Sequence, residues 1–328
     1  MAENPNYENQ KLNDKKILLI GVKFYHFTHE VIAKMKHYGA DVTFFYERDT
    51  SLKFAFAKTF NSDYADKLQE NHYQNVLAKV KDTKFDYLLV IRGYMMEPWF
   101  VKEIKNSNPG IKTIMYQWDS YSNWECDYRH MISSFDVVKT FDPRDAEELN
   151  LPYVPTFSSD EYSNLPEEKP KYDIFYSGGF TYPRYDFLKQ IINYSKDNNL
   201  KLYSHLAISM KSYLREIAGG NKIDPSLLSF KNLNKEEYLK VFIASNVIID
   251  YTKDNQAGIT MRTLDTLMAG KKILTNNTFV SQEPGFRPDQ VQFFNPKEFA
   301  ADQEFVKKEV YFPKLDYSID KFLANIFN

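Results

Sequence analysis

The chain has 328 residues, more than one typical hydrophobic core accommodates, so we expect two domains of about 100 to 200 residues each. Apolar residues make up 43% of the sequence and aromatic residues 16%, which excludes a disordered protein. With 42 basic and 44 acidic residues, the net charge is −2 and no stripe of Lys and Arg forms, so nucleic acid is not an expected partner.

The single cysteine and the N-terminal residues bear on the compartment. Cys126 alone forms neither an intramolecular disulfide nor a cysteine-based metal cage, which favours a reducing compartment. The polar start of the chain has no apolar segment typical of a signal peptide, and no 18 apolar residues occur together. We therefore expect a cytoplasmic protein and leave open whether it docks at the inner face of the membrane.

The first half of the chain alternates predicted strands and helices. Residues 15–22 are a short continuous apolar run, typical of a buried parallel strand. Helical spacing follows until Gly39, and a strand resumes at 41–47. The alternation continues with predicted strands at 86–93, 112–119 and 136–142 and predicted helices near 98–107 and 124–134. This pattern predicts a parallel sheet covered by helices.

The second half repeats this organisation after a segment without periodicity. Residues 151–173 contain four prolines, serines and mixed charges, which predicts a linker. Predicted strands follow at 172–179, 201–207, 246–251, 271–276 and 291–295, with helices from Pro183, at 235–245 and within 256–277. Residues 317–328 have the apolar spacing of a terminal helix.

The fold predicted from this pattern is α/β, with two Rossmann-like domains facing a cleft. The predicted division is an N-terminal domain at 1–156, a linker at 157–171, a C-terminal domain at 172–310 and a terminal helical segment at 311–328.

Several common catalytic signatures are absent from the sequence. There is no G-x-G, Walker loop or G-x-S-x-G, which excludes the usual dinucleotide, kinase and hydrolase motifs. His29 and Glu30 begin like a zinc-protease motif, but Ala33 stands where its second histidine would be. No Asp-x-Asp occurs, so we expect no metal clamp on a nucleoside diphosphate.

Two loops in the second half have the composition of phosphate sites. In "YSGGFTYPR" (176–184), a strand runs into Ser177, Gly178 and Gly179, where backbone N–H groups approach an anion closely, and Arg184 lies beside the next helix start. An ordinary glycine turn after a strand is the alternative.

The second loop is "QAGITMRTLDTLMAGKKILTNN" (256–277). We predict a helix that begins at Gly258, Ile259 and Thr260, whose N–H groups favour a phosphate, with Arg262 in the same turn. Arg262 and Asp265 share a side away from the apolar face, so Asp265 is placed to bind a ribose diol; an i,i+3 surface ion pair is the alternative.

These two stretches resemble the donor-binding half of bacterial GT-B glycosyltransferases, especially CgeB-like and lipopolysaccharide or capsule biosynthesis members. In that family, a segment of the form G-x-x-x-R-x-x-E-x-x-x-x-G-x-x-x-[IV]-[ST] binds the nucleotide-sugar donor. The residues that match it, or lie one step away, are Gly258, Arg262, Gly270, Ile273 and Thr275, while Asp265 replaces the commoner Glu. The resemblance covers about residues 172–280, and it implies that residues 317–327 cross back to the first domain.

The resemblance implies transfer of a sugar from a nucleotide-sugar donor to a glycan or lipid-linked acceptor in surface polysaccharide synthesis, without a metal or other cofactor. If the anomeric configuration inverts, a base from the first domain is required, and Asp119 at the end of a predicted strand is the first candidate, followed by His26. A helix cap is the alternative role for Asp119. The aromatic side chains around it that offer stacking faces for an acceptor, or fill the core, are Tyr116, Trp118, Tyr121 and Trp124.

Two other functions fit the same sequence. A non-catalytic sugar- or nucleotide-binding protein also consists of two α/β domains around a cleft. A polyol-phosphate or phosphoryl transferase uses similar phosphate-binding loops.

Overall fold

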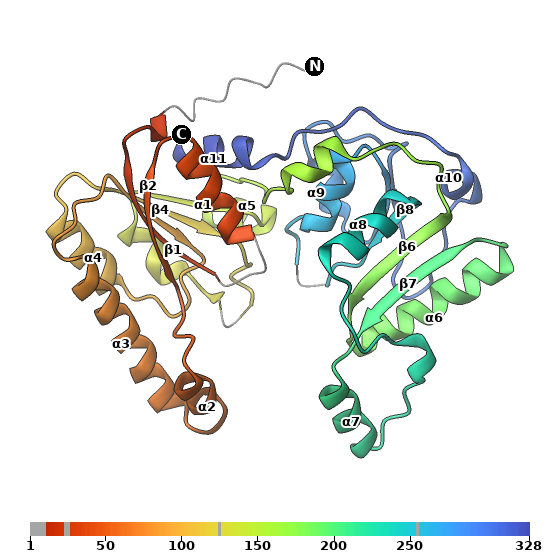
Figure 1. The fold of residues 1–328 in the computed structure, drawn as a ribbon, viewed down its shortest axis with the longest axis horizontal. Helices are drawn as coiled ribbons and strands as arrows, with labels where there is room; N and C mark the ends of the chain where they lie inside the picture. The colour runs from red at the N-terminus through yellow and green to blue at the C-terminus, as the bar shows by residue number, and fades with distance from the viewer. Residues whose placement is uncertain (1–10, 23–26, 124–125, 254–255) are drawn as a thin grey trace. The chain divides into compact units, whose positions relative to one another are not determined.

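The computed structural model describes residues 11–22, 27–123, 126–253 and 256–328, and the chain divides into two compact units. Unit 1 comprises Met1–Ser159, Asp254–Ile259 and Tyr317–Asn328, and unit 2 comprises Asp160–Lys253 and Thr260–Asp316. Each unit is an α/β layer structure built on one five-stranded sheet (Figure 1).

The sheet of unit 1 is wholly parallel, with the order β2-β1-β3-β4-β5. Its strands are β1 (Lys16–Gly21), β2 (Asp41–Tyr46), β3 (Tyr87–Ile91), β4 (Lys112–Gln117) and β5 (Val137–Thr140). The four central residues of β1, Ile17 to Ile20, are buried completely, as a strand between two helical layers requires. In this strand order, β2 and β3 lie on opposite sides of β1. The strand order thus reverses between β1 and β3, which is a topological switch point.

Helices cover both faces of this sheet. One face packs against α3 (Ser62–Val80), α4 (Pro98–Ser107) and the short helix η3 (Arg129–Ser134) through a shared apolar cluster. The other face packs against α1 (Phe27–His37) and the C-terminal helix α11 (Ile319–Phe327), which lie side by side in Figure 1. The remaining helices of unit 1 are α2 (Leu52–Phe60) and α5 (Pro143–Leu149).

The C-terminal helix belongs to unit 1 although the preceding residues belong to unit 2. Lys34 Nζ on α1 lies 2.9 Å from the Asp320 carboxylate, and the Phe322 ring lies 5.0 Å from that of Tyr116 on β4. Apolar burial and a half-buried ion pair thus fasten the end of the chain to the first sheet.

The sheet of unit 2 has the same topology, with the order β10-β9-β8-β6-β7. Its strands are β6 (Tyr172–Gly179), β7 (Leu202–Ala207), β8 (Ser245–Asp250), β9 (Lys272–Thr275) and β10 (Val291–Phe293), all paired in parallel. The corresponding switch point lies between β6 and β8.

Unit 2 also has helices on both faces of its sheet. Helices α6 (Tyr182–Asp197) and α10 (Gln303–Lys307) pack on one face, and α8 (Lys235–Ile243) and α9 (Met261–Met268) lie on the other. The remaining helices are α7 (Met210–Ala218) and the short η4 (Asp160–Asn164), η5 (Pro225–Leu227) and η6 (Thr278–Gln282).

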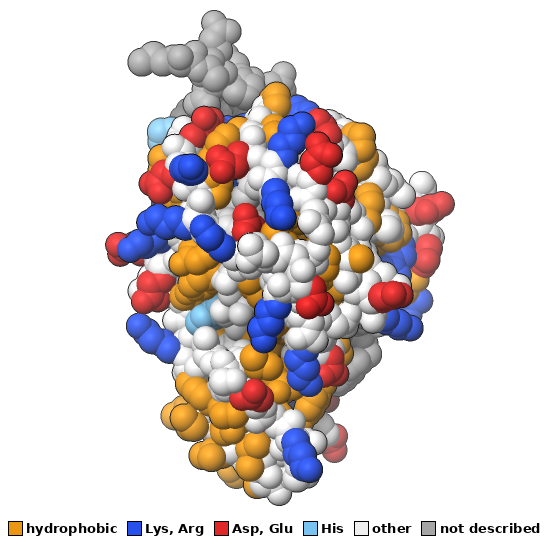
Figure 2. Space-filling view, turned by 90° about the vertical axis from the view of Figure 1, so that its right-hand side faces the viewer, with side chains coloured by type: hydrophobic (Ala, Val, Ile, Leu, Met, Phe, Trp, Pro, Cys, Tyr) orange, Lys and Arg blue, Asp and Glu red, His pale blue; other side chains and the backbone are white. Residues whose placement is uncertain are grey.

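Helix α7 differs from the other α-helices of unit 2, α6, α8, α9 and α10, because none of its residues is buried. Figure 2 shows hydrophobic side chains gathered at the lower end of the view, where Figure 1 places α7. Across the described ranges, no helix combines the length and the apolar composition that spanning a bilayer requires.

The predicted α/β class and all predicted strands are confirmed, with three differences in detail. Helices α2 and α3 occupy residues 52–80, which had no assignment, and the described part of the helix predicted at 124–134 contains the shorter helix η3. The units meet at Ser159 and Asp160, inside the predicted linker. Residues 256–259 cluster with unit 1, whereas the prediction included them in the C-terminal domain at 172–310.

Candidate functional site

In unit 2, polar side chains converge where β6 and β8 end. Arg262, in the first turn of α9, donates from Nη2 to Ser177 Oγ at 3.3 Å and from Nε to the Tyr238 hydroxyl at 3.4 Å. Its Nη1 lies 3.6 Å from Asp250 Oδ1. Residues from β6, α8, β8 and α9 therefore meet at the switch point, where open α/β sheets bind ligands.

Asp250 fixes this arrangement from inside the protein. Its side chain is 3% exposed, and its Oδ2 accepts hydrogen bonds from the hydroxyls of Thr252 (3.1 Å), Thr260 (2.8 Å) and Thr263 (3.2 Å). With Oδ2 saturated, Oδ1 faces Arg262. Burial opposes the charge of Arg262, but Tyr238 and Asp250 raise its pKa above the ordinary value, so the guanidinium stays charged.

A second arginine, Arg184, lies at the edge of the same sheet. Its guanidinium donates to the carbonyl oxygens of Gly179 and Tyr251, both at 3.4 Å, and it forms no ion pair within the part of unit 2 that the structure describes. Its alkyl chain runs past Gly178, where a Cβ would lie 3.6 Å from Arg184 Cδ. Arg184 is half-buried, and no carboxylate of the described residues lies within ion-pair distance of its guanidinium.

The phenol of Tyr176 is surrounded by these charges. Tyr176 is fully buried, and its hydroxyl has no hydrogen-bond partner in the described ranges. Burial raises its pKa, while the charges of Arg184 and Arg262 both act to lower it. Both guanidinium groups therefore act on the hydroxyl of Tyr176, and they make the end of β6 electropositive.

Unit 1 presents a different group of charges at the end of β3. Arg92 has a left-handed backbone (φ 71°) directly after the strand, and its Nε donates to Glu47 Oε1 at 2.8 Å. Glu47 is 1% exposed, and its second oxygen accepts the N–H groups of Gly93 (3.0 Å) and Tyr94 (2.8 Å). Arg92 Nη1 lies 3.3 Å from Asp119 Oδ2.

Cys126 completes this network. Its thiol donates to Asp119 Oδ2 at 3.5 Å. Burial, followed by the Asp119 charge, raises the pKa of Cys126 to about 12, so the thiol is protonated at neutral pH. A nucleophilic role requires the thiolate, and Cys126 is therefore no reactive cysteine.

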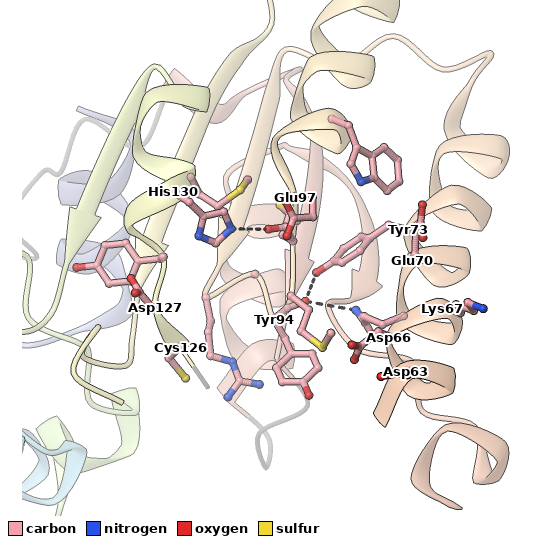
Figure 3. Close-up of a pocket in the computed structure, with 18 residues that line it drawn as sticks. Asp63, Asp66, Lys67, Glu70, Tyr73, Tyr94, Glu97, Cys126, Asp127 and His130 are labelled. Carbon is pink, nitrogen blue, oxygen red and sulfur yellow. Dashed lines mark hydrogen bonds between the residues drawn. The ribbon is translucent and has the colours of Figure 1, made fainter. Parts of the chain in front are cut away.

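A cavity of about 720 Å³ opens beside Arg92, between α3 and the segment around Cys126 (Figure 3). Its wall contains more carboxylates than cations: Asp63, Asp66, Glu70, Glu97 and Asp127 against Lys67 and Arg92. Asp127 is held by Arg129 at 2.7 Å, which lowers its pKa to about 2. This cavity is therefore electronegative, unlike the edge of the second sheet.

Comparison with known proteins identifies the fold of the whole chain. No protein-family model matches the chain, and no curated protein matches its sequence. Among solved structures, Anabaena Alr3699/HepE in complex with UDP and glucose is 10% identical, with a TM-score of 0.53 over 96% of this chain and 89% of that chain. HepE in complex with UDP alone is 9% identical, with a TM-score of 0.52 over 86% of both chains.

An α-glucosyltransferase in complex with UDP and a 13-mer DNA is 14% identical, with a TM-score of 0.53 over 87% of this chain and 86% of that chain. The chain has the GT-B fold. The GT-B architecture predicted from the sequence is confirmed, whereas the CgeB-like subtype stays a prediction.

Within this GT-B chain, the predicted residues Ser177, Gly178, Gly179, Arg184 and Arg262 share one edge of the second sheet. The two glycines are the last residues of β6 and pair with β7, in agreement with the strand predicted at 172–179. Gly179 is exposed, and a Cβ built on it would meet no atom within 4 Å. The backbone there is accessible to a ligand.

The predicted helix start at Gly258 is wrong. Helix α9 begins at Met261, and Thr260 is its N-cap, accepting from the N–H of Thr263 at 3.2 Å. The N–H of Gly258 donates to Asp142 Oδ2 at 3.3 Å, so it does not belong to a free helix N-terminus. The absence of a side chain at 258 has a packing reason, since a Cβ would lie 2.1 Å from the Phe141 ring.

Ile259 and Asp265 also differ from their predicted settings. Ile259 is 2% exposed and Asp265 is 7% exposed, because all residues from Thr263 to Met268 are buried. A surface ion pair between Arg262 and Asp265 is therefore excluded, and a ribose would reach Asp265 only after local movement. The charge of Asp265 acts on the buried phenols of Tyr162 and Tyr238.

The predicted acceptor residues are only partly accessible. Tyr116 is fully buried, donates to the Val154 carbonyl at 3.1 Å and packs on α11, which corrects its expected stacking role. Tyr121 and Trp118 are half-buried. His26 and Trp124 lie outside the described residues.

Sequence reasoning missed Glu47, Arg92, Asp142 and Asp250. Each is the last or next-to-last residue of a predicted strand. The argument that selected Asp119, that polar residues at strand ends point toward a ligand, therefore applies to them as well. Asp142 caps α5 by accepting from the N–H of Arg144 at 2.9 Å.

Proposed function

We propose that this GT-B chain transfers a sugar from a nucleotide-sugar donor to a glycan or lipid-linked acceptor. The observation that supports this most directly is the electropositive end of β6, where Arg184 and Arg262 act on one place and Ser177 lies within hydrogen-bond distance of Arg262. The HepE and α-glucosyltransferase structures contain UDP, which favours a nucleoside diphosphate as the ligand of this edge.

In this proposal, unit 2 binds the donor diphosphate. The sugar–phosphate bond breaks with the electron pair passing to the diphosphate, and the two guanidinium groups stabilise the charge that develops there. Fixed positive groups cost little reorganisation, and Arg262 is held by Asp250 and Tyr238 before any ligand arrives. We further propose that these arginines take the place of a divalent metal, which predicts that a chelator leaves transfer unchanged.

Unit 1 binds the acceptor in the same proposal. For an inverting reaction, the acceptor hydroxyl attacks the anomeric carbon and its proton passes to Asp119. The Asp119 side chain is 35% exposed and is oriented by Arg92 at 3.3 Å. The electronegative cavity beside it favours an acceptor moiety that is neutral or cationic.

A nucleotide panel tests the donor assignment. We expect UDP or another nucleoside diphosphate to raise the melting temperature, because a ligand at 100 times its Kd adds about 2.7 kcal/mol to the stability of the folded state. The panel comprises UDP, GDP, ADP, TDP, CDP and CMP. If no nucleotide shifts the transition, the transferase proposal fails; if one does, its sugar conjugate is the donor for an assay of nucleotide release.

A further inference from the structure

Helix α7 presents an apolar face that nothing in unit 2 covers. Met210, Leu214 and Ile217 occupy positions i, i+4 and i+7 and are 52%, 58% and 41% exposed. Monomeric proteins seldom leave a contiguous row of large apolar side chains in water without a partner.

Two further side chains extend this face. The Tyr182 hydroxyl donates to Glu216 on α7, and the Phe230 ring contacts that of Tyr213 on α7 with 5.2 Å between centroids. Tyr182 is 43% exposed and Phe230 is 40% exposed. We define the α7 patch as Tyr182, Met210, Leu214, Ile217 and Phe230; hydrophobic side chains gather there in Figure 2.

The charges around the α7 patch are mostly positive. From Ser209 to Lys231 the chain has four Lys and Arg residues against two Asp and Glu residues. One of the two acidic side chains, Glu216, is engaged by Tyr182 and by Asn221 at 2.9 Å. Apolar side chains interspersed with Lys and Arg on one short helix are typical of helices that lie in a membrane interface.

We propose that the α7 patch docks the chain on an anionic lipid surface, with α7 lying in the interface plane. The apolar side chains enter the acyl boundary, while Lys211, Arg215 and their neighbours contact lipid phosphates. A helix of nine residues is only about 14 Å long, so its face is too small to bury the ~800 Å² per partner that a stable dimer needs. Two copies of a cationic patch also repel each other. A lipid surface fits better than a second copy.

The patch adjoins the proposed donor site, since Tyr182 stands two residues before Arg184. Docking would therefore bring the nucleotide-sugar to lipid headgroups and favour a lipid-linked acceptor. That last step rests on the proposed transferase function, whereas lipid docking itself does not.

The region around α2 provides a matched control. Phe56 and Phe60 are 67% and 71% exposed, more than any residue of the α7 patch. From Arg48 to Glu70, however, four basic residues are balanced by four acidic ones. Helix α2 itself carries Lys53 and Lys58, so exposure and the charge of the helix alone predict that α2 binds lipid. Apolar exposure combined with the net charge of the wider segment predicts α7 instead.

The experiment is co-sedimentation of the full chain with vesicles of phosphatidylglycerol and phosphatidylethanolamine, compared with phosphatidylcholine vesicles. We expect binding to the anionic vesicles alone, weakened by salt. Met210→Ser with Leu214→Ser should weaken binding at least about tenfold through lost apolar burial. Lys211→Gln with Arg215→Gln should weaken it about 25-fold, the equivalent of two surface cations.

Phe56→Ser with Phe60→Ser should bind vesicles as the parent chain does. All variants should keep the parent melting temperature and its shift with nucleotide, which separates a failure of docking from a failure of the proposed function. The proposal fails if the parent chain does not bind anionic vesicles, or if the α7 variants bind as the parent does. It also fails if light scattering in the absence of lipid shows a dimer that the α7 variants disrupt, because the occupant is then a second copy.

Discussion

One arginine at the carboxyl edge of the first sheet and two at that of the second differ in the acidic groups around them. Arg92 in unit 1 contacts two carboxylates, those of Glu47 and Asp119. Arg262 in unit 2 contacts one, Asp250, and shares its edge with Arg184, whose contacts among the described residues are carbonyl oxygens. The same topology therefore produces an edge with excess negative charge in one unit and excess positive charge in the other.

Under the proposed function, the fold determines where a ligand binds and the side chains determine which ligand binds. Both switch points bring strand ends and helix starts together. The positive edge favours a diphosphate, and the negative edge favours an acceptor hydroxyl with a nearby carboxylate as base. Four predictions, which use three substitutions besides their controls, test this comparison.

Asp119→Asn should have the largest effect. Loss of a general base lowers the rate of transfer about 100- to 10,000-fold, while nucleotide affinity stays unchanged because Asp119 belongs to unit 1. Initial rates of nucleotide release and a nucleotide titration measure the two quantities. Asp82→Asn, an exposed carboxylate of unit 1 outside the cavity, is the control; undiminished transfer by Asp119→Asn would remove Asp119 from the mechanism.

Arg92→Ala should destabilise unit 1. Glu47 would remain buried without its guanidinium partner, a change that costs about 3 to 5 kcal/mol. Urea unfolding measures the loss. Arg129→Ala removes an exposed pair with Asp127 that solvent screens, and should leave the urea midpoint almost unchanged; equal effects of the two substitutions would contradict the structural role of Arg92.

Arg262→Ala should weaken nucleotide binding without abolishing the fold. The lost charged contact is worth about 1.5 to 3 kcal/mol, or roughly a 10- to 150-fold rise in Kd. Isothermal titration with the nucleotide from the panel measures it. Arg287→Ala, which removes a contact to the Pro313 carbonyl in the same unit, should bind normally; unchanged affinity in Arg262→Ala would end the assignment of the positive edge.

The smallest effect concerns Cys126. Its pKa of about 12 means that alkylation by iodoacetamide is slow at pH 8 and accelerates only as pH rises toward 12. Asp119→Asn removes a negative neighbour, so the pKa should fall and alkylation at pH 9 should be faster by up to about tenfold, the equivalent of one pKa unit. Mass spectrometry follows the single thiol, and an unchanged rate profile would show that Asp119 contributes little to the negative edge.

Much of the fold could be predicted because buried parallel strands require continuous apolar runs. Residues 15–22, 86–93 and 246–251 are such runs, and all became central strands. The site was predictable only in part. Ser177 and Arg262 stand out by composition, but their contact joins residues 85 apart in the chain, which no local pattern reports.

Local features of the sequence determined the two-domain α/β class, the strand positions and the donor-type stretches at 176–184 and 256–277, because periodicity and turn chemistry act over a few residues. Tertiary structure alone decided that Asp142 takes the N–H of Gly258, that Asp265 is buried and that Asp250 holds Arg262. It also decided that α7 remains uncovered. These outcomes depend on which distant segments pack together, and packing is a property of the whole chain.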